Sequence, residues 1–133
     1  MAKGYDANQQ RQMSLSAYGK DLARRSKSKC ELSGASGVPL HIYEIPPAPA
    51  EPEYDRCLML SEHVIDQINK PSLIIPDHWR NLGELIWSEI PAVQVMALRL
   101  LTQIAESENW AQDIIDEAQL DDDLLDMADE EVK

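Results

Sequence analysis

The chain has 133 residues, the usual size of one domain or of two subdomains that share one core. Hydrophobic residues make up 44% of it, but there is no Phe and there are only three Trp and four Tyr, so any core must be largely aliphatic. The formal net charge of −12 argues against broad nucleic-acid binding, which requires the neutralisation of phosphates. The first ten residues lack the apolar segment of a secretion signal, and no long uncharged apolar run follows. With two cysteines and no such signal, we expect a cytoplasmic protein with reduced thiols and no contact with a membrane.

The charge is unevenly distributed along the chain. Residues 1–30 contain seven basic and two acidic residues, whereas residues 106–133 contain twelve acidic residues and one basic residue. The simplest interpretation of the acidic end is a solvated helical face that keeps the protein soluble. The alternative is that the two ends are docking surfaces of opposite charge.

The N-terminal half predicts one helix followed by a β-hairpin. Residues 1–13 are polar and are expected to form a flexible N-terminus, after which Ser14 or Ser16 caps a helix that runs toward Arg25. A turn-rich segment leads from Cys30 to a strand at residues 40–45, where hydrophobic residues alternate with polar ones. Prolines make residues 46–52 an extended loop, and residues 57–60 form a second strand.

The remaining chain predicts helices. Ser61 caps a helix that ends before Pro71, and Asp77 caps a helix that contains Trp79. Pro91 occupies the first position of a long helix to Ala105 that is apolar around most of its circumference and should be the central core helix. Caps at Asn109 and Asp121 begin two last helices. The predicted fold class is therefore α+β, mainly α, with a small hairpin subdomain at residues 14–70 packed on a helical subdomain at residues 71–133 that contains about four helices.

Four positions of the N-terminal subdomain have the layout of a treble-clef or zinc-ribbon unit. In such a unit two Cys-x-x-Cys pairs, one in a turn and one at a helix start, place four thiolates around one zinc ion. The corresponding positions are Cys30, Ser33, Ser61 and Val64, so three of the four ligands are absent. We expect Ser33 to stabilise its turn, Ser61 to cap its helix and Val64 to pack in the core.

The same segments resemble a known family. The stretches CELSGASGVPLHIYEIPPAP, RCLMLSEHVIDQI, HWRNLGELIWSEIPAVQVMALRLL and ENWAQDIIDEAQL are similar to the N-terminal zinc-ribbon and helical region of proteobacterial PhnA/YjdM-like proteins. The resemblance covers roughly residues 14–128 and implies a zinc ribbon, a helical segment and then a small β-barrel. This chain departs from the pattern at the three missing ligands, and it ends where the barrel would begin. The family name suggests a part in alkylphosphonate utilisation.

No cofactor is expected. A serine hydroxyl is a poor zinc ligand and valine is none, so a metal site would have to recruit Cys30, Cys57 and His63, with His41 as a further candidate. Zinc binding is therefore the less favoured alternative.

An enzyme is also the less favoured interpretation. The strand position where HNH nucleases carry their catalytic histidine is occupied by Tyr43 and Glu44, and His41 has no partner base in the sequence around it. His78 is interpreted as a surface or capping residue. The possible partner surface, and the only basic cluster that could hold a nucleic acid, contains four residues: Arg24, Arg25, Lys27 and Lys29.

The sequence therefore predicts a non-catalytic cytoplasmic interaction or regulatory module whose partner is a protein, with self-association as one form. An accessory protein or enzyme of phosphonate metabolism is the alternative that the resemblance implies. An HNH-like or nucleic-acid-binding treble clef is the second alternative. Trp79, Trp87 and Trp110 are expected to anchor the core, and any that is exposed becomes the best candidate for a partner contact.

Overall fold

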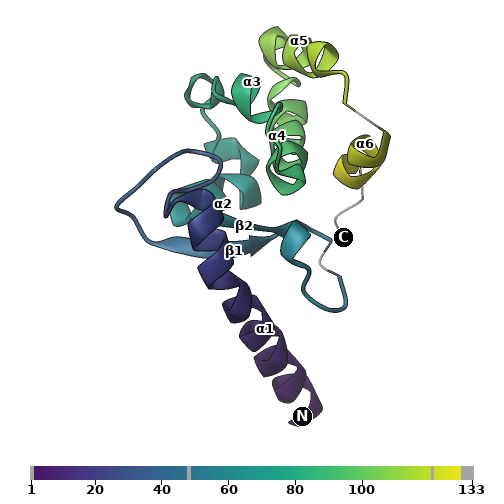
Figure 1. Cartoon of the computed structure of the whole chain (residues 1–133). Helices are drawn as coiled ribbons and strands as arrows, with labels where there is room; N and C mark the ends of the chain where they lie inside the picture. Colours follow the sequence, from purple (N-terminus) through teal and green to yellow (C-terminus); the bar gives the residue numbers. More distant parts are fainter. Residues whose placement is uncertain (1, 48, 121, 130–133) are drawn as a thin grey trace.

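The structure of the protein is a computed structural model that describes residues 2–47, 49–120 and 122–129. It is mainly helical with a small two-stranded sheet, so the predicted α+β, mainly α class is confirmed (Figure 1). The helices are α1 (Ala2–Ser26), α2 (Glu62–Asn69), α3 (Leu82–Leu85), α4 (Pro91–Ile104), α5 (Asn109–Ala118) and α6 (Asp122–Asp129). Three 3₁₀ turns complete the elements: η1 (Tyr54–Arg56), η2 (Pro71–Leu73) and η3 (Pro76–Trp79).

The sheet is an antiparallel hairpin of β1 (Leu40–Glu44) and β2 (Cys57–Ser61). Leu40 is paired with Ser61 at one end and Glu44 with Cys57 at the other. The two predicted strands are thus confirmed to within one residue. The loop between them is rich in proline, which has no backbone N–H to offer a strand partner, and this keeps the pairing short.

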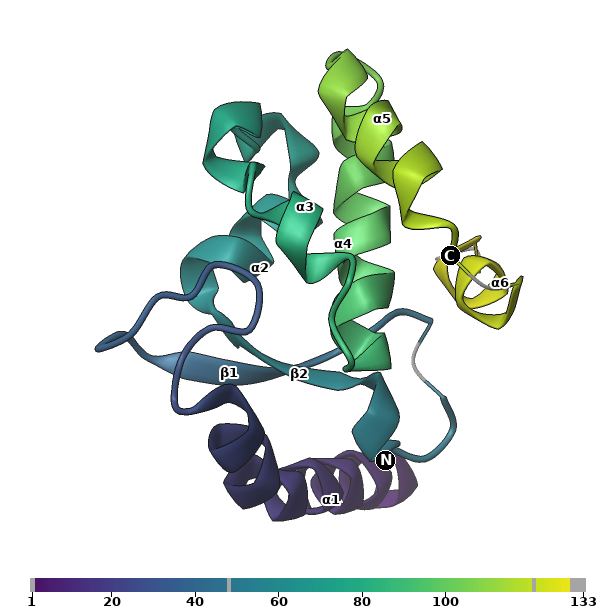
Figure 2. The same cartoon turned by 45° about the horizontal axis from the view of Figure 1, so that its top comes forward.

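Both faces of the hairpin are covered. Side chains alternate along a strand, so Leu58 and Leu60 of β2 belong to the main core cluster with α4, whereas Cys57 and Met59 belong to a second cluster with α1. Figure 2 shows α1 beneath the hairpin and α4 above it. All five residues of β2 are buried as a result.

Helix α4 is the centre of the larger core, as predicted. Pro91 occupies its first turn, and nine of its fourteen residues are buried. Helices α5 and α6 pack on α4 (Figures 1 and 2). The main cluster contains residues from both sides of the predicted boundary at residues 70 and 71. None of the helices in the described residues combines the length and apolarity needed to span a bilayer.

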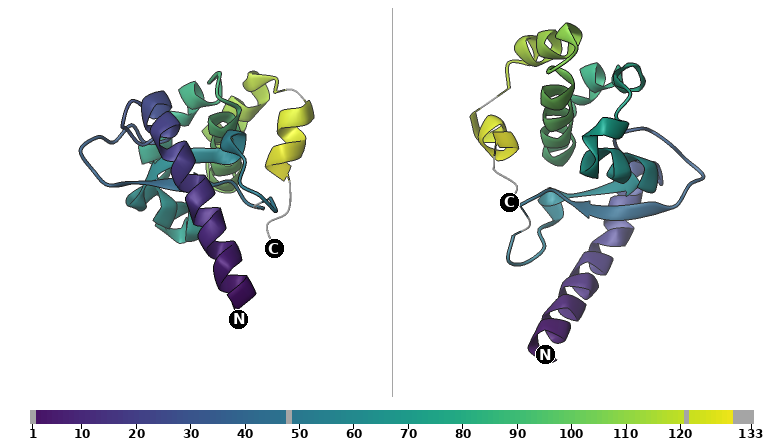
Figure 3. Two further views of the ribbon diagram at one scale, coloured as in Figure 1. Left: turned by 60° about the horizontal axis from the view of Figure 1, so that its bottom comes forward. Right: turned by 180° about the vertical axis from the view of Figure 1, so that it is seen from behind.

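The predicted start of the first helix is wrong. Helix α1 begins at Ala2 instead of Ser14 or Ser16. Its sequence contains no proline and no β-branched residue, and Ala, Lys, Gln and Arg, which all favour helix, are frequent in its first half. The N-terminal half of α1 extends beyond the hairpin (Figure 3). The flexibility of residues 1–13 stays a prediction.

Two predicted helix caps are also wrong. Asp77 lies inside the turn η3, which begins at Pro76, and its exposed carboxylate is 3.4 Å from Arg80 instead of capping a helix. The expected helix is therefore divided into η3 and α3. Asn109 is the first residue of α5, and the preceding Glu108 makes no side-chain cap. The cap predicted at Asp121 lies outside the described residues.

The central position of α4 predicts a large stability loss on truncation of one buried side chain. Leu101 is 0% exposed. Replacing it by alanine removes packed methyl groups and leaves a cavity, so Leu101→Ala should lower the free energy of unfolding by about 2–5 kcal/mol, measured by urea denaturation. The matched control is Leu73→Ala at a residue that is 48% exposed, where a change within about 0.5 kcal/mol is expected. Equal losses in the two variants would contradict this description of the core.

Candidate functional site

The turn that begins at Cys30 is closed by its own backbone. The amide of Gly34 donates to the carbonyl oxygen of Cys30 over 2.8 Å, and the amide of Cys30 donates to the carbonyl oxygen of Ala35 over 2.9 Å. Gly34 adopts a φ of +77°, a left-handed conformation that glycine accepts without strain. The turn directs the sulfur of Cys30 inward, where the residue is only 2% exposed.

Two of the other three predicted ligand positions, Ser33 and Ser61, contact that sulfur. The amide of Ser33 is 3.5 Å from Cys30 Sγ. Burial opposes ionisation of the thiol, but hydrogen bonds from Ser33, from the backbone of Ser61 and from the backbone of Leu32 outweigh it and hold the pKa of Cys30 below its ordinary value. Amide donors that converge on a cysteine sulfur stabilise negative charge there, as they do around a metal-bound thiolate.

The three positions that lack cysteine have the local roles that were predicted. Ser61 Oγ accepts a hydrogen bond from the amide of Val64 over 3.4 Å and caps α2. Ser33 Oγ accepts from the amide of Ala35 over 3.3 Å and so stabilises the turn. Val64 is 1% exposed and belongs to the main core cluster.

The alternative metal ligands are not brought together. Cys57 lies in the second cluster, on the α1 side of the hairpin, while Cys30 lies in the main cluster. His63 and His41 are exposed. Among the residues that the structure describes, no three His, Cys, Asp or Glu side chains are grouped closely enough to hold a metal ion.

Beside Ser33 and Val64 is a hollow of about 420 Å³ whose wall was not predicted. Trp79 donates from Nε1 to Gln67 Oε1 over 2.9 Å, and both side chains are buried. Asn81 donates from Nδ2 to the carbonyl oxygen of Leu32 over 2.8 Å and so joins the segment before α3 to the Cys30 turn. The sequence contains one signal for the bond between Trp79 and Gln67: Gln67 follows Val64 by three residues and so lies on the same buried face of α2.

No protein-family model, no curated protein and no solved structure matches the chain.

The predicted basic cluster is only partly on the surface. Arg24, Lys27 and Lys29 are exposed. Arg25 instead forms a bidentate pair with Glu31, with nitrogen–oxygen distances of 3.0 and 2.8 Å, and also donates to the carbonyl oxygen of Cys57. Its guanidinium lies 5.2 Å from the centre of the Tyr54 ring. Arg25 therefore joins α1 to the turn and to β2.

The residues at the nuclease-like position have structural contacts of their own. Glu44 is paired with Arg11 of α1. Tyr43 packs against the main core cluster, and His41 and His78 are both exposed. Glu44 therefore helps to hold α1 on the hairpin, and Tyr43 helps to hold the hairpin on the core.

The two cysteines differ in acidity, and this difference predicts a dependence of stability on pH. Burial and the nearby charge of Glu44 raise the pKa of Cys57 to about 11. In the unfolded chain the same thiol has its ordinary pKa of about 8.5 and loses its proton earlier. The folded state therefore loses stability as the pH rises from about 8.5 toward 11.

The urea concentration at the midpoint of unfolding is measured for the parent protein and for Cys57→Ser at several pH values in that range. The fall in stability should be smaller in the variant, because a serine does not ionise there. Parallel curves for the two proteins would show that Cys57 contributes nothing to it.

Proposed function

We propose that this protein is a non-catalytic cytoplasmic interaction module that docks an oppositely charged protein surface. The observation that carries the proposal is the exposure of Trp87, which is 62% exposed instead of anchoring the core as expected. Exposed tryptophans at the edge of a hollow are frequent anchors of protein interfaces.

Trp87 lies at a hollow of about 250 Å³ beside α5 and α6. The wall of the hollow combines apolar side chains, among them Ile86, Ala118, Leu120 and Leu124, with the polar side chains of Gln94 and Gln119. The exposed residues of these two helices include six acidic ones: Asp113, Asp116, Glu117, Asp122, Asp123 and Asp126. An apolar centre with a charged rim is the usual composition of a docking surface.

The charges of opposite sign are kept on opposite sides of the molecule. The basic residues Arg24, Lys27 and Lys29 lie at and just after the C-terminal end of α1, which covers one face of the hairpin, whereas α5 and α6 pack on α4, which covers the other face (Figure 2). A basic surface that fits the acidic face is therefore present on a second copy of the same chain. Electrostatic complementarity of this kind increases the association rate and selects the partner.

The test is the oligomeric state of the whole chain by sedimentation velocity at about 20 mM and about 500 mM salt, since salt shortens the range of charge interactions. We expect self-association at low salt that weakens at high salt. Trp87→Ala should weaken it about thirtyfold, the loss typical of a tryptophan anchor.

Ile75→Ala is the matched control, because Ile75 is also an exposed apolar residue, at 52%. It should leave the association unchanged. A monomer at every salt concentration would remove the second copy as the partner, and an oligomer that ignores salt would contradict the electrostatic basis of the docking.

We further propose that residues 30–70 retain the shape of a treble-clef-like zinc knuckle, as the resemblance to PhnA/YjdM-like proteins implies. The proposal is supported by the amides that converge on Cys30 and by the cap at Ser61, which places Val64 one helical turn beyond it. In this protein side-chain packing and hydrogen bonds occupy the place of the metal.

This proposal predicts that zinc binding can be restored by three substitutions. The triple variant Ser33→Cys, Ser61→Cys and Val64→Cys should bind one zinc ion per chain, with a melting temperature that falls when a chelator is added. Metal content is measured by native mass spectrometry. Losing the Ser61 cap should cost the metal-free variant about 1 kcal/mol, so its stability without zinc should be below that of the parent.

The control triple variant carries Ser36→Cys in place of Ser33→Cys. It has the same number of thiols, but the first pair no longer has the spacing that a tetrahedral site requires. Equal zinc binding by the two triple variants would contradict the proposed knuckle. Zinc bound at Cys30 in the parent protein would contradict the claim that packing and hydrogen bonds occupy the place of the metal.

A further inference from the structure

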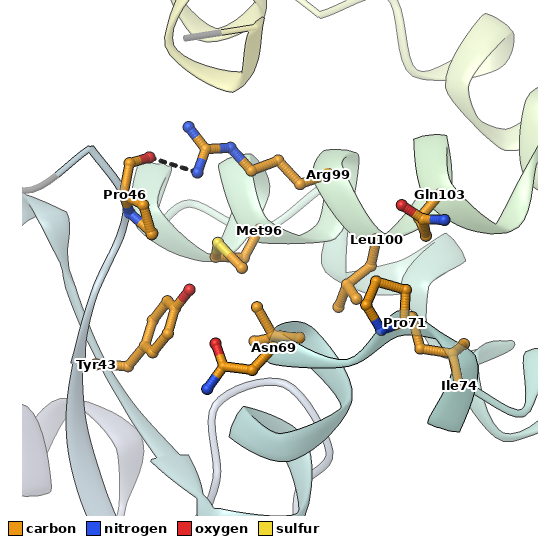
Figure 4. Close-up of a pocket in the computed structure, with 10 residues that line it drawn as sticks. Tyr43, Pro46, Asn69, Pro71, Ile74, Met96, Arg99, Leu100 and Gln103 are labelled. Carbon is orange, nitrogen blue, oxygen red and sulfur yellow. Dashed lines mark hydrogen bonds between the residues drawn. The ribbon is translucent and has the colours of Figure 1, made fainter. Parts of the chain in front are cut away.

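A third hollow lies between the hairpin, α2 and α4. Its volume is about 410 Å³, within the range of about 300–1,000 Å³ that is usual for small-molecule sites. Tyr43 of β1, Asn69 of α2, Pro71 and Ile74 around η2, and Leu100 of α4 all line it (Figure 4). Three segments that are distant in the sequence, at residues 43–46, 68–74 and 96–103, therefore meet around one space.

One end of the hollow is formed by Tyr43 and Arg99. Arg99 donates to the carbonyl oxygens of Pro46, Met127 and Ala128, at 2.5, 3.0 and 3.2 Å, and these bonds fix its guanidinium at this end. Burial raises the pKa of Tyr43, and the positive charge of Arg99 partly offsets the effect. The Tyr43 hydroxyl is therefore protonated at neutral pH and able to donate a hydrogen bond within reach of a positive charge.

The middle and the far end of the hollow are apolar. Figure 4 shows Met96 and Leu100 of α4 along one wall, between the Tyr43 end and the Pro71–Ile74 end. Ile68 adds to the same surface. A ligand that lies along this wall would bury a hydrocarbon body, which contributes about 25 cal/mol for each Å² removed from water.

The charge of the hollow is opposite to that of the chain. The formal net charge of the protein is −12, yet none of the ten described residues that line this space is an Asp or a Glu. The one charged side chain among them is Arg99. An anionic group would meet a cation and a hydroxyl donor at this end of the hollow.

We propose that this hollow binds an amphipathic monoanion, a medium-chain alkyl carboxylate, with its carboxylate at Tyr43 and Arg99 and its hydrocarbon chain along Met96 and Leu100 toward Ile74. The site is separate from the docking surface at Trp87. Binding here would also brace the contact that Arg99 makes between α4, the loop after β1 and the end of α6.

The experiment compares three probes with the same ten-carbon chain, each titrated into the whole ¹⁵N-labelled protein below its micelle concentration. Decanoate should shift the backbone amide signals of residues that line the hollow. Decanol should bind at least tenfold more weakly, and decyltrimethylammonium should cause no saturable shifts there. Equal affinity for decanoate and decanol would overturn the anionic preference, and saturable decanoate shifts confined to other residues, or no saturable shifts, would overturn the site.

Two pairs of variants test the two ends of the ligand. Tyr43→Phe should weaken decanoate binding about tenfold and decanol binding much less, since the lost hydrogen bond is to a charged group. Its control, Tyr18→Phe, removes a hydroxyl that donates to the carbonyl oxygen of Pro52 on the α1 side of the hairpin and should leave binding unchanged.

At the hydrocarbon end, Ile74→Ser should weaken decanoate and decanol alike. Its control, Ile75→Ser, alters the adjacent exposed residue and should have no effect on either probe. Folding of each variant is checked by its amide spectrum. If Tyr43→Phe and Tyr18→Phe bind decanoate with the same affinity, the proposed place of the carboxylate is wrong.

Discussion

A two-stranded hairpin is marginally stable in water by itself, and the need to cover both of its faces determines the arrangement of the rest of the protein. Every residue of β2 is buried, which is possible only because α1 packs on one face and α4 on the other. The pair of Arg25 and Glu31 secures the first of these contacts, with side chains only 16% and 3% exposed. Breaking a pair as buried as this by removing one partner costs about 3–5 kcal/mol, because the other charge remains in a poorly solvated place.

The same layering explains how packing holds the Cys30 turn and the start of α2 together, as the proposed knuckle requires. Structural zinc contributes on the order of 10–16 kcal/mol to a small knuckle that has little core of its own. Here the turn and α2 are joined to a larger apolar cluster through Val64, Leu32 and Leu60. The buried bond between Trp79 and Gln67 and the bond from Asn81 to Leu32 hold the segment after α2 against the same region. Metal binding and core packing are in this sense alternative ways of fixing the same two chain segments.

Much of the fold could be predicted because its signals are local. Each of three signals reports the conformation of a few neighbouring residues: the alternation along residues 40–44, the cap at Ser61, and Pro91 at the start of α4. The start of α1 could not be predicted in this way, because Ser14 and Ser16 are good caps that the continuous helix makes unnecessary. The hollow at Tyr43 and Arg99 could not be predicted either, since those residues are 56 positions apart and only the packing of the hairpin on α4 brings them together. The exposure of Trp87 likewise depends on where α5 and α6 come to lie.

Glu31 also has a consequence for the outer edge of the sheet. Its amide donates to the carbonyl oxygen of Met59, and its carboxylate accepts from the amide of Met59, so one residue satisfies the outward-facing backbone groups at the middle of β2. Unpaired groups along a sheet edge attract strands from other molecules and promote aggregation. Because the Glu31 carboxylate is held by Arg25 and already accepts from the Met59 amide, that amide is not open to a strand of another molecule. The hairpin is thereby kept at two strands on this side, and the side chain of Glu31 protects the Met59 amide from pairing with a strand of another molecule.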